Sequence, residues 1–320
     1  MNTRILIWLL AAFSVVASAE EQTIPDYSPF KLITKVEHQP IAEMSGLIKS
    51  RTFENVYWAH NDSGDSARLF AVNRDGKVIF PGFLGRTYHG EQAEPNKTEW
   101  PGLTLHQATN IDWEDIAVDG DRLLIADVGN NGNARRDMGI YVLSEPNPRS
   151  TYEARVLRHI PIAYPEQQNY PATHWHFDSE SIFVDRGKIY LITKHREDRK
   201  IGEFESGANL YRLDSEHSNK INYLEKVDHL DSLAIATGAD LSPDGKHLAV
   251  ITYVGLWVFD KPQRGDKWLS SKARFAPIDH KLMTQMEAVT WDDNKTILIS
   301  NEGRQVFEIN LDQLDYADPD

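Results

Sequence analysis

Short apolar segments, each headed by a small or acidic residue, recur five times along the chain, at 45–48, 114–118, 180–184, 238–242 and 287–291. A second apolar segment follows each of them, in most cases after a turn rich in Asp and Gly, at 56–59, 123–126, 189–193, 248–252 and 297–300. A third closes each unit, at 68–73, 139–143, 209–213, 256–259 and 305–309. The segments are rich in Val, Ile, Leu and aromatic residues, which predicts β-strands.

The units begin about 50 to 70 residues apart, which is room for four short antiparallel strands and their turns. Fourth strands are predicted at 77–84, 154–162, 221–230 and, more weakly, 272–278. The last unit lacks a fourth strand, and residues 30–37 are placed to supply it. The pattern therefore predicts an all-β fold, a β-propeller of five four-stranded blades closed by the N-terminal strand. The alternative is a six-bladed ring with an extra blade in residues 86–112. This stretch contains Pro and Gly, and we interpret it as a loop.

Five long connections are predicted to open on one face of the ring, at 60–67, 86–112, 127–138, 163–179 and 194–208. Strands alternate in direction within a blade, so second-to-third connections and blade-to-blade connections leave the same side. Long loops gathered over one mouth of a propeller channel indicate a binding face.

The N-terminus predicts export. Arg4, an apolar run over 5–17 and the small-x-small triplet Ala17-Ser18-Ala19 predict a cleaved signal peptide at 1–19. Residues 20–320 then form one propeller domain, located in a periplasm or outside the cell. No later apolar run is long enough to span a membrane.

The composition and charge of the chain limit the reactions and partners that are possible for it. The chain has no cysteine, which excludes disulfides and thiol chemistry, and its formal net charge is −14. This acidity argues against nucleic acid and anionic membranes as partners, which require clustered Lys and Arg. We expect a monomer whose partner is a small-molecule substrate or an extracytoplasmic protein or glycan.

The heads of the innermost strands supply candidate metal ligands. The matched positions carry Ser45, Glu114, Glu180, Gly238 and Glu287. Three carboxylates around a narrow axis require a cation or shared protons to coexist. Oxygen ligands suit Ca²⁺, and the absence of His or Cys in this register disfavours Zn²⁺. We therefore predict a Ca²⁺ site formed by Ser45, Glu114, Glu180 and Glu287. The alternative is that these acids bond backbone amides of neighbouring blades.

Candidate substrate groups follow the second strands, where the loops begin. The predicted catalytic residues are Asp62, as the base that orients water, with Lys194 and Arg196 as partners for phosphate oxygens. The predicted substrate-binding residues are His60, Asn61, Asp127, Tyr253 and Glu302. An ordinary polar turn explains any one of them alone, so their convergence on one face carries the prediction.

Several motifs resemble those of exported bacterial propeller proteins sometimes described as esterase-like or phytase-like. The motifs are residues 60–65 (HNDSGD), 112–117 (DWEDIA), 127–131 (DVGNN), 191–194 (LITK) and 237–245 (TGADLSPDG). The inner ring is also similar to that of calcium-activated nucleotidases, or apyrases, which are five-bladed propellers with channel Ca²⁺. Gly238 departs from that ring, because the nucleotidases have a side-chain ligand there. This second resemblance implies a metal and, by analogy alone, nucleotide hydrolysis.

Three functional hypotheses follow. The first is a Ca²⁺-dependent hydrolase of phosphate esters or anhydrides. The second is a non-catalytic propeller that binds a protein or glycan and uses Ca²⁺ structurally. The third is a lactonase-like or esterase-like hydrolase.

Overall fold

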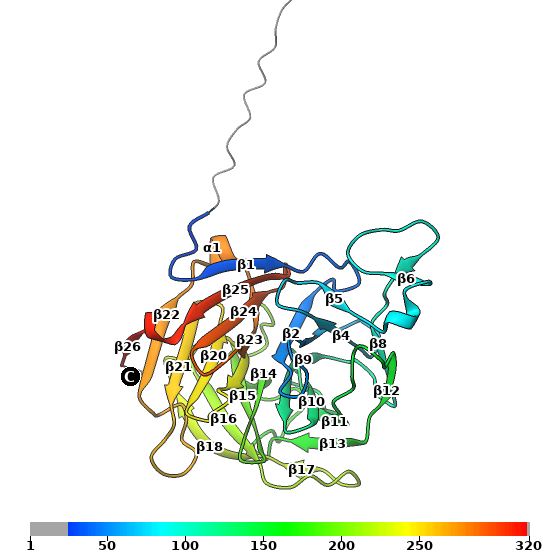
Figure 1. Ribbon diagram of the computed structural model, residues 1–320. Coiled ribbons are helices and arrows are strands. Elements are labelled where there is room, and N and C mark those ends of the chain that lie inside the picture. The colour runs from blue at the N-terminus through cyan, green and yellow to red at the C-terminus, as the bar shows by residue number, and fades with distance from the viewer. Residues whose placement is uncertain (1–24, 319–320) are drawn as a thin grey trace, which may run out of the picture.

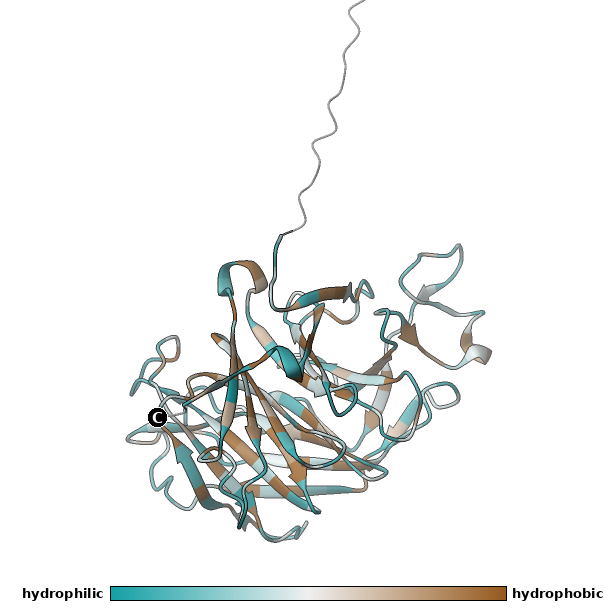
Figure 2. Ribbon diagram, turned by 60° about the vertical axis from the view of Figure 1, so that its left-hand side comes forward, coloured by the Kyte–Doolittle hydropathy of each residue, from teal (hydrophilic) through white to brown (hydrophobic). Residues whose placement is uncertain are grey.

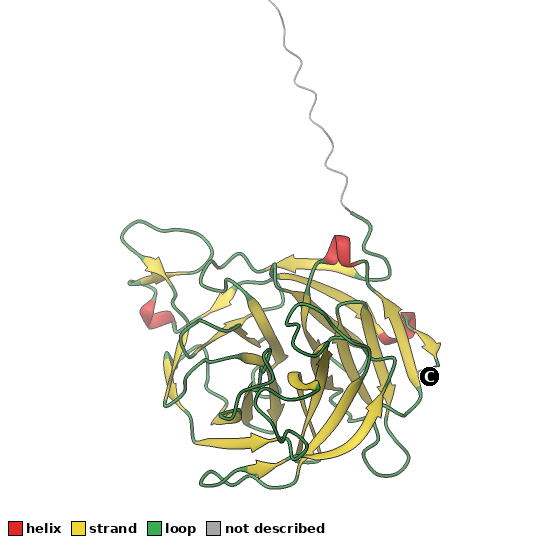
Figure 3. Cartoon of the chain, turned by 180° about the vertical axis from the view of Figure 1, so that it is seen from behind, coloured by secondary structure: helices red, strands yellow, loops and turns green. Residues whose placement is uncertain are grey.

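The computed structural model describes residues 25–318, and its strands form five sheets arranged around a common centre (Figure 1). The prediction of a five-bladed β-propeller is confirmed, and the six-bladed alternative is wrong. The predicted signal peptide at 1–19 lies outside the described residues. Figure 3 shows the ring from behind, with connecting loops crossing its middle.

Each blade has four antiparallel strands that follow one another from the channel to the rim. Blade 1 contains β2 (Met44–Lys49), β3 (Tyr57–Asn61), β4 (Arg68–Val72) and β8 (Leu103–His106). Blade 2 contains β9 (Trp113–Asp119), β10 (Arg122–Asp127), β11 (Gly139–Ser144) and β13 (Arg158–Ala163). Blade 3 contains β14 (Trp175–Asp185), β15 (Lys188–Arg196), β16 (Ala208–Leu213) and β18 (Glu225–Leu230). Blade 4 contains β19 (Ala236–Leu241), β20 (His247–Thr252), β21 (Gly255–Asp260) and β22 (Ala273–Pro277). Blade 5 contains β23 (Met286–Trp291), β24 (Thr296–Asn301), β25 (Gln305–Asn310) and β1 (Lys31–Lys35).

The N-terminal strand closes the ring, as the sequence predicts. Strand β1 pairs antiparallel with β25 and becomes the outer strand of blade 5. Three short strands lie along the outer edges of other blades: β12 (Glu153–Arg155) on β8, β17 (Asn222–Tyr223) on β13, and β26 (Asp315–Ala317) on β22. These additions occupy backbone groups that an open sheet edge would leave unpaired.

The outer strands of blades 1 to 3 differ from the prediction. The strand expected over 77–84 is only β5 (Val78–Ile79), and the main outer strand of blade 1 is β8, inside the stretch interpreted as a loop. Strand β8 does alternate, because Leu103 and Leu105 are buried while its other two residues are exposed. The stretch also contains β6 (Tyr88–His89) and β7 (Thr98–Glu99). The single strands expected at 154–162 and 221–230 are each divided, and their first parts, β12 and β17, join the preceding blade.

The hydrophobic core lies between the blades. Five buried clusters occur, and each combines side chains from two adjacent blades, so both faces of every sheet are covered. This explains why strands such as β10, β20 and β24 contain runs of buried apolar residues, and in Figure 2 brown segments alternate with white and teal ones along the strands. The described residues contain one short α-helix, α1 (His280–Met283), and two 3-10 turns, η1 (Gly82–Leu84) and η2 (Leu311–Gln313). None of these helices has the length and apolar character needed to cross a membrane.

The buried carboxylate of Asp115 joins three blades. It accepts hydrogen bonds from the backbone amides of Ile116 (2.8 Å), Ile182 (2.9 Å) and Ala239 (3.1 Å), which lie in blades 2, 3 and 4. Burial raises the pKa of Asp115, and these three bonds oppose the shift. One side chain thereby fixes the spacing of three inner strands near the axis.

All five innermost strands contain a β-bulge at the same level. The register shifts place the extra residue at Ser45, Glu114, Glu180, Thr237 and Glu287. The alignment of blade 4 from the sequence is therefore wrong by one residue, because Thr237 rather than Gly238 occupies the equivalent position. A bulge redirects a side chain out of the regular alternation and is common beside active sites. The Oγ atoms of Ser45 and Thr237 donate to backbone carbonyls of the next blade, at 2.9 and 2.7 Å.

Candidate functional site

A cavity of about 280 Å³ lies at the channel mouth, at the ends of the inner strands. Its lining includes nine of the twelve predicted site residues: Ser45, Asp62, Glu114, Glu180, Lys194, Arg196, Tyr253, Glu287 and Glu302. All five blades contribute to it. The second-to-third-strand connections supply Asp62, Asn131, Phe204, Tyr253 and Glu302, and the bulged inner strands supply Ser45, Glu114, Glu180 and Glu287.

The other three predicted residues do not line the cavity. His60 is fully buried, and its ring packs edge-on against Trp113 at 5.7 Å. The side-chain amide of Asn61 donates to the carbonyl of Pro40 at 2.9 Å, which anchors the start of the loop. Asp127 forms an ion pair with Arg135 at 2.9 Å. Their contacts are those of residues that hold the surrounding loops.

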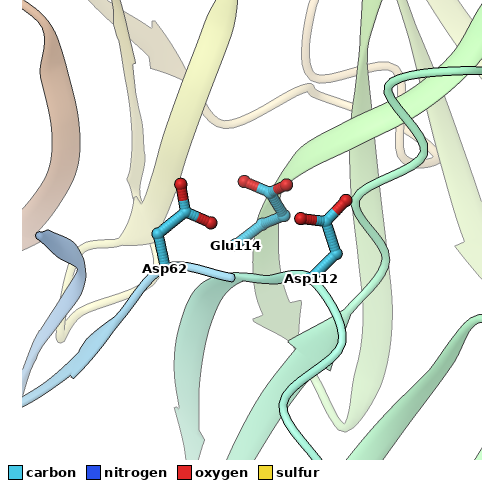
Figure 4. A group of neighbouring side chains, drawn as sticks. All are labelled: Asp62, Asp112 and Glu114. Carbon is cyan, nitrogen blue, oxygen red and sulfur yellow. The ribbon is translucent and has the colours of Figure 1, made fainter. Parts of the chain in front are cut away.

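Two overlapping groups of carboxylates lie beside the cavity. The first contains Asp62, Asp112 and Glu114, and the second contains Glu114, Asp178 and Glu180. In each group, one oxygen from every member lies within 4.8 Å of the others. Figure 4 shows the side chains of the first group directed into a common space.

Asp112 and Asp178 are site residues that the sequence-based prediction did not include. Each precedes a bulged glutamate by two positions, so blades 2 and 3 share the pattern Asp-x-Glu. The bulge interrupts the regular alternation at this point, so the repetition of Asp-x-Glu in two blades is the sequence signal for a second carboxylate in each.

The two groups differ in how their charge is compensated. In the second group, Glu180 forms an ion pair with Lys194, and Asp178 binds the Nε of Arg196 at 2.8 Å. In the first group, within residues 25–318, no lysine or arginine forms an ion pair with Asp62, Asp112 or Glu114. The first group therefore has no direct ion pair, although the charge of Lys194 opposes the rise in the pKa of Glu114 and the charge of Arg135 opposes that of Asp112.

Burial and repulsion from neighbouring acids raise the pKa values of Asp112 and Glu114. Burial, reinforced by the charges of Asp62 and Asp178, raises the pKa of Asp112 to about 6. Burial and the charge of Asp112 raise the pKa of Glu114 well above its ordinary value. The carboxylates press against the backbone at Gly129, where a Cβ would lie 2.1 Å from Oε1 of Glu114 and 2.4 Å from Oδ2 of Asp112. Only glycine fits at this position without moving both acids.

Glu287 is separate from both carboxylate groups. Its Oε1 accepts a hydrogen bond from the hydroxyl of Tyr253 at 3.2 Å. Burial raises the pKa of Glu287 to about 7, although the charge of Lys194 opposes the shift. A carboxylate that titrates near neutral pH is suited to transfer protons in catalysis.

In chelator, the contribution of Glu287 and Asp112 to the free energy of unfolding is expected to fall as the pH rises from about 5 to 8. Glu287 and Asp112 have a higher pKa in the folded state than in the unfolded chain, so the folded state retains protons that the unfolded chain releases. Their stabilising contribution is present below the unfolded pKa and lost as the pH passes the folded values of about 7 and 6. The loss from Glu287 alone is on the order of 3 kcal/mol.

Denaturant unfolding at several pH values measures this slope, and Glu287→Gln is expected to reduce it. If a divalent cation binds the carboxylates, adding that cation is expected to restore stability above pH 7. The histidines His38, His60, His159 and His195 have lowered pKa values and act in the opposite direction below about pH 6.5, so the readout is the difference in stability between the wild type and Glu287→Gln. A difference that stays constant over this range would contradict the raised pKa of Glu287.

No protein-family model matches the chain, and no curated protein matches it. Solved β-propeller enzymes are similar in structure at low identity. A luciferin-regenerating enzyme has 11% identity and a TM-score of 0.45, with 87% of this chain and 75% of that chain covered. A glutaminyl cyclase from Myxococcus xanthus has 13% identity and a TM-score of 0.45, with 90% and 97% covered. A PQQ-bound aldose sugar dehydrogenase from Streptomyces coelicolor has 9% identity and a TM-score of 0.43, with 88% and 97% covered.

Proposed function

We propose that this protein is an exported, Ca²⁺-dependent hydrolase whose reaction takes place in the cavity at the channel mouth. The observation that carries the proposal is the group formed by Asp62, Asp112 and Glu114. These three carboxylates converge within 4.8 Å, and none of them forms an ion pair with a lysine or arginine of residues 25–318. Such a group is stable at neutral pH only with protons or a cation between its members.

The donor set fits Ca²⁺. Carboxylate oxygens from two blades, with space for water on the side of the cavity, match the preference of Ca²⁺ for six to eight oxygen ligands. The predicted ligands change accordingly, because Asp62 and Asp112 join Glu114, whereas Glu180 is already paired with Lys194. The hydroxyl of Ser45 is likewise engaged, since it donates to the carbonyl of Glu114. A bound Ca²⁺ would polarise the substrate oxygen that it contacts.

Glu287 is the proposed general base. Its pKa of about 7 allows it to accept a proton from water at neutral pH, and Tyr253 holds its carboxylate in place. This assignment replaces the role predicted for Asp62, which lies in the proposed Ca²⁺ group. Glu287 in turn leaves the predicted ligand set.

The charge of the cavity favours an uncharged ester or lactone as substrate. Six carboxylates line it, from Glu43, Asp62, Glu114, Glu180, Glu287 and Glu302, whereas its cationic side chains are Lys194 and Arg196. Both cations form ion pairs with acids of the site. After one Ca²⁺ binds, the lining still carries an excess of carboxylates, which repels a phosphate dianion.

Phosphate ester hydrolysis is the second candidate. It is favoured by the position of Lys194 and Arg196 in the cavity lining, where both contact the ring of Phe204 at 5.4 and 4.8 Å from its centre. A phosphate group would have to exchange partners with Glu180 and Asp178 to use these two cations.

A substrate panel in excess Ca²⁺ and in excess chelator tests both candidates. The panel contains acyl esters, lactones, phosphate esters and nucleotides. We expect Ca²⁺-dependent turnover of acyl esters or lactones. Turnover confined to the phosphate compounds would overturn the substrate assignment in favour of the second candidate. Protein that binds Ca²⁺ and hydrolyses nothing in the panel would support a binding propeller with structural Ca²⁺.

A further inference from the structure

Glu114 belongs to both carboxylate groups of the site. It is 6% exposed, and within residues 25–318 its carboxylate has no hydrogen bond or ion pair, although it faces Asp112 on one side and Glu180 on the other. A carboxylate shared by two sets of acids is the arrangement found where two divalent cations lie about 3.5–4 Å apart. The two groups of acids therefore form two adjacent positions at which a cation can bind.

The second position already contains a cation that belongs to the chain. The ammonium of Lys194 contacts Oε1 of Glu180, and the guanidinium of Arg196 lies 3.8 Å from the same oxygen while it binds Asp178. Lys194 is 2% exposed, and its ammonium lies 5.4 Å from the ring centre of Phe204 and 5.9 Å from that of Tyr253. The packing of these two rings holds the ammonium against the acids.

We propose that the ammonium of Lys194 occupies the second cation position, so that the protein binds a single Ca²⁺, in the group Asp62, Asp112 and Glu114. This inference rests on the proposed function, because it specifies the composition of the same site. Lys194 is then a residue that determines the number of metal ions and neutralises Glu180. Its predicted role as a phosphate partner is secondary to this one.

Calcium stoichiometry, measured by calorimetry and by equilibrium dialysis, tests the inference independently of activity. The wild type is expected to bind one Ca²⁺ at this site. Lys194→Met retains the apolar stem and removes only the ammonium, and it is expected to bind two. The double variant Lys194→Met with Glu180→Gln also removes the acid that the first change leaves unpaired, and it is expected to bind one again.

Two further variants control the experiment. Lys188→Met removes a half-exposed lysine from the same strand, β15, and is expected to leave the stoichiometry at one. Lys194→Gln is likewise expected to bind two Ca²⁺ ions. Its amide can still donate to Glu180, so it serves if the methionine variant does not fold.

The outcomes separate this inference from the proposed function. A wild type and a Lys194 variant that each bind one Ca²⁺ overturn the inference and leave the proposed function standing. A wild type that binds two shows that Lys194 does not exclude the second ion. A wild type that binds none overturns both proposals.

Discussion

Replacing Asp115 with Ala is expected to lower the free energy of unfolding by about 3–5 kcal/mol, which is a large part of the stability of an ordinary domain. Its carboxylate is 1% exposed and accepts three backbone N–H groups from blades 2, 3 and 4. Alanine leaves these buried donors without an acceptor, at roughly 1–3 kcal/mol each before relaxation or entry of water. Asp115→Asn is expected to lose less, because one amide oxygen can still accept.

Equilibrium unfolding in denaturant measures the effect. Asp121→Ala is the matched control, because it removes an exposed carboxylate from the turn of the same blade and is expected to change stability by less than about 0.5 kcal/mol. If Asp115→Ala loses less than about 1 kcal/mol, the three hydrogen bonds do not hold the inner strands together.

The largest expected effect on turnover comes from Glu287→Gln, which is predicted to reduce kcat about 10²–10⁴-fold. The change retains the shape of the side chain and its acceptor oxygen for Tyr253, but it removes the base. In the wild type, kcat/KM is expected to rise with pH as Glu287 loses its proton. The midpoint of this rise is expected at or below the pKa of about 7, because a Ca²⁺ ion nearby favours the ionised form of Glu287. This rise is expected to disappear in the variant.

Two control variants separate proton transfer from metal binding. Asp62→Asn is expected to weaken Ca²⁺ binding, whereas Glu287→Gln is expected to leave the Ca²⁺ affinity nearly unchanged. Glu302→Gln alters an exposed acid in the lining of the same cavity and is expected to reduce kcat less than tenfold. A Glu287→Gln variant that retains the wild-type rate and pH profile would remove Glu287 from the reaction.

The repeat pattern predicted the fold because the interior of a propeller is made of many similar strands. The heads of four of the five inner strands and the closing strand at 30–37 could be identified from residue type alone. The outer strand β8 could not, because four residues directly after Pro101 and Gly102 give too short an alternation. Strands β12 and β17 overlap the strands predicted at 154–162 and 221–230, but their pairing with the preceding blade was not predicted, since joining a neighbouring blade leaves no mark in the local sequence.

The sequence predicted most of the residues that meet at the site. It did not predict which of them form ion pairs and hydrogen bonds with one another. A β-bulge adds one residue without changing composition, so Thr237 could not be distinguished from Gly238 until the register was known. Asp178 belongs to an Asp-x-Glu pattern in the sequence, but the sequence-based prediction of the site did not include it. The pairing of Lys194 with Glu180 depends on two strands of one blade and on the rings of Phe204 and Tyr253, which are distant in the sequence.

The closure of the ring by β1 has a consequence for the order of folding. Strand β1 precedes every other strand of the five blades, and its partner β25 follows all of them, so the ring cannot close until all five blades have been synthesised. The four interfaces from blade 1 to blade 5 can form in succession, but the interface between blades 5 and 1 must form last. We therefore expect the nascent chain to remain an open arc until β25 has been synthesised.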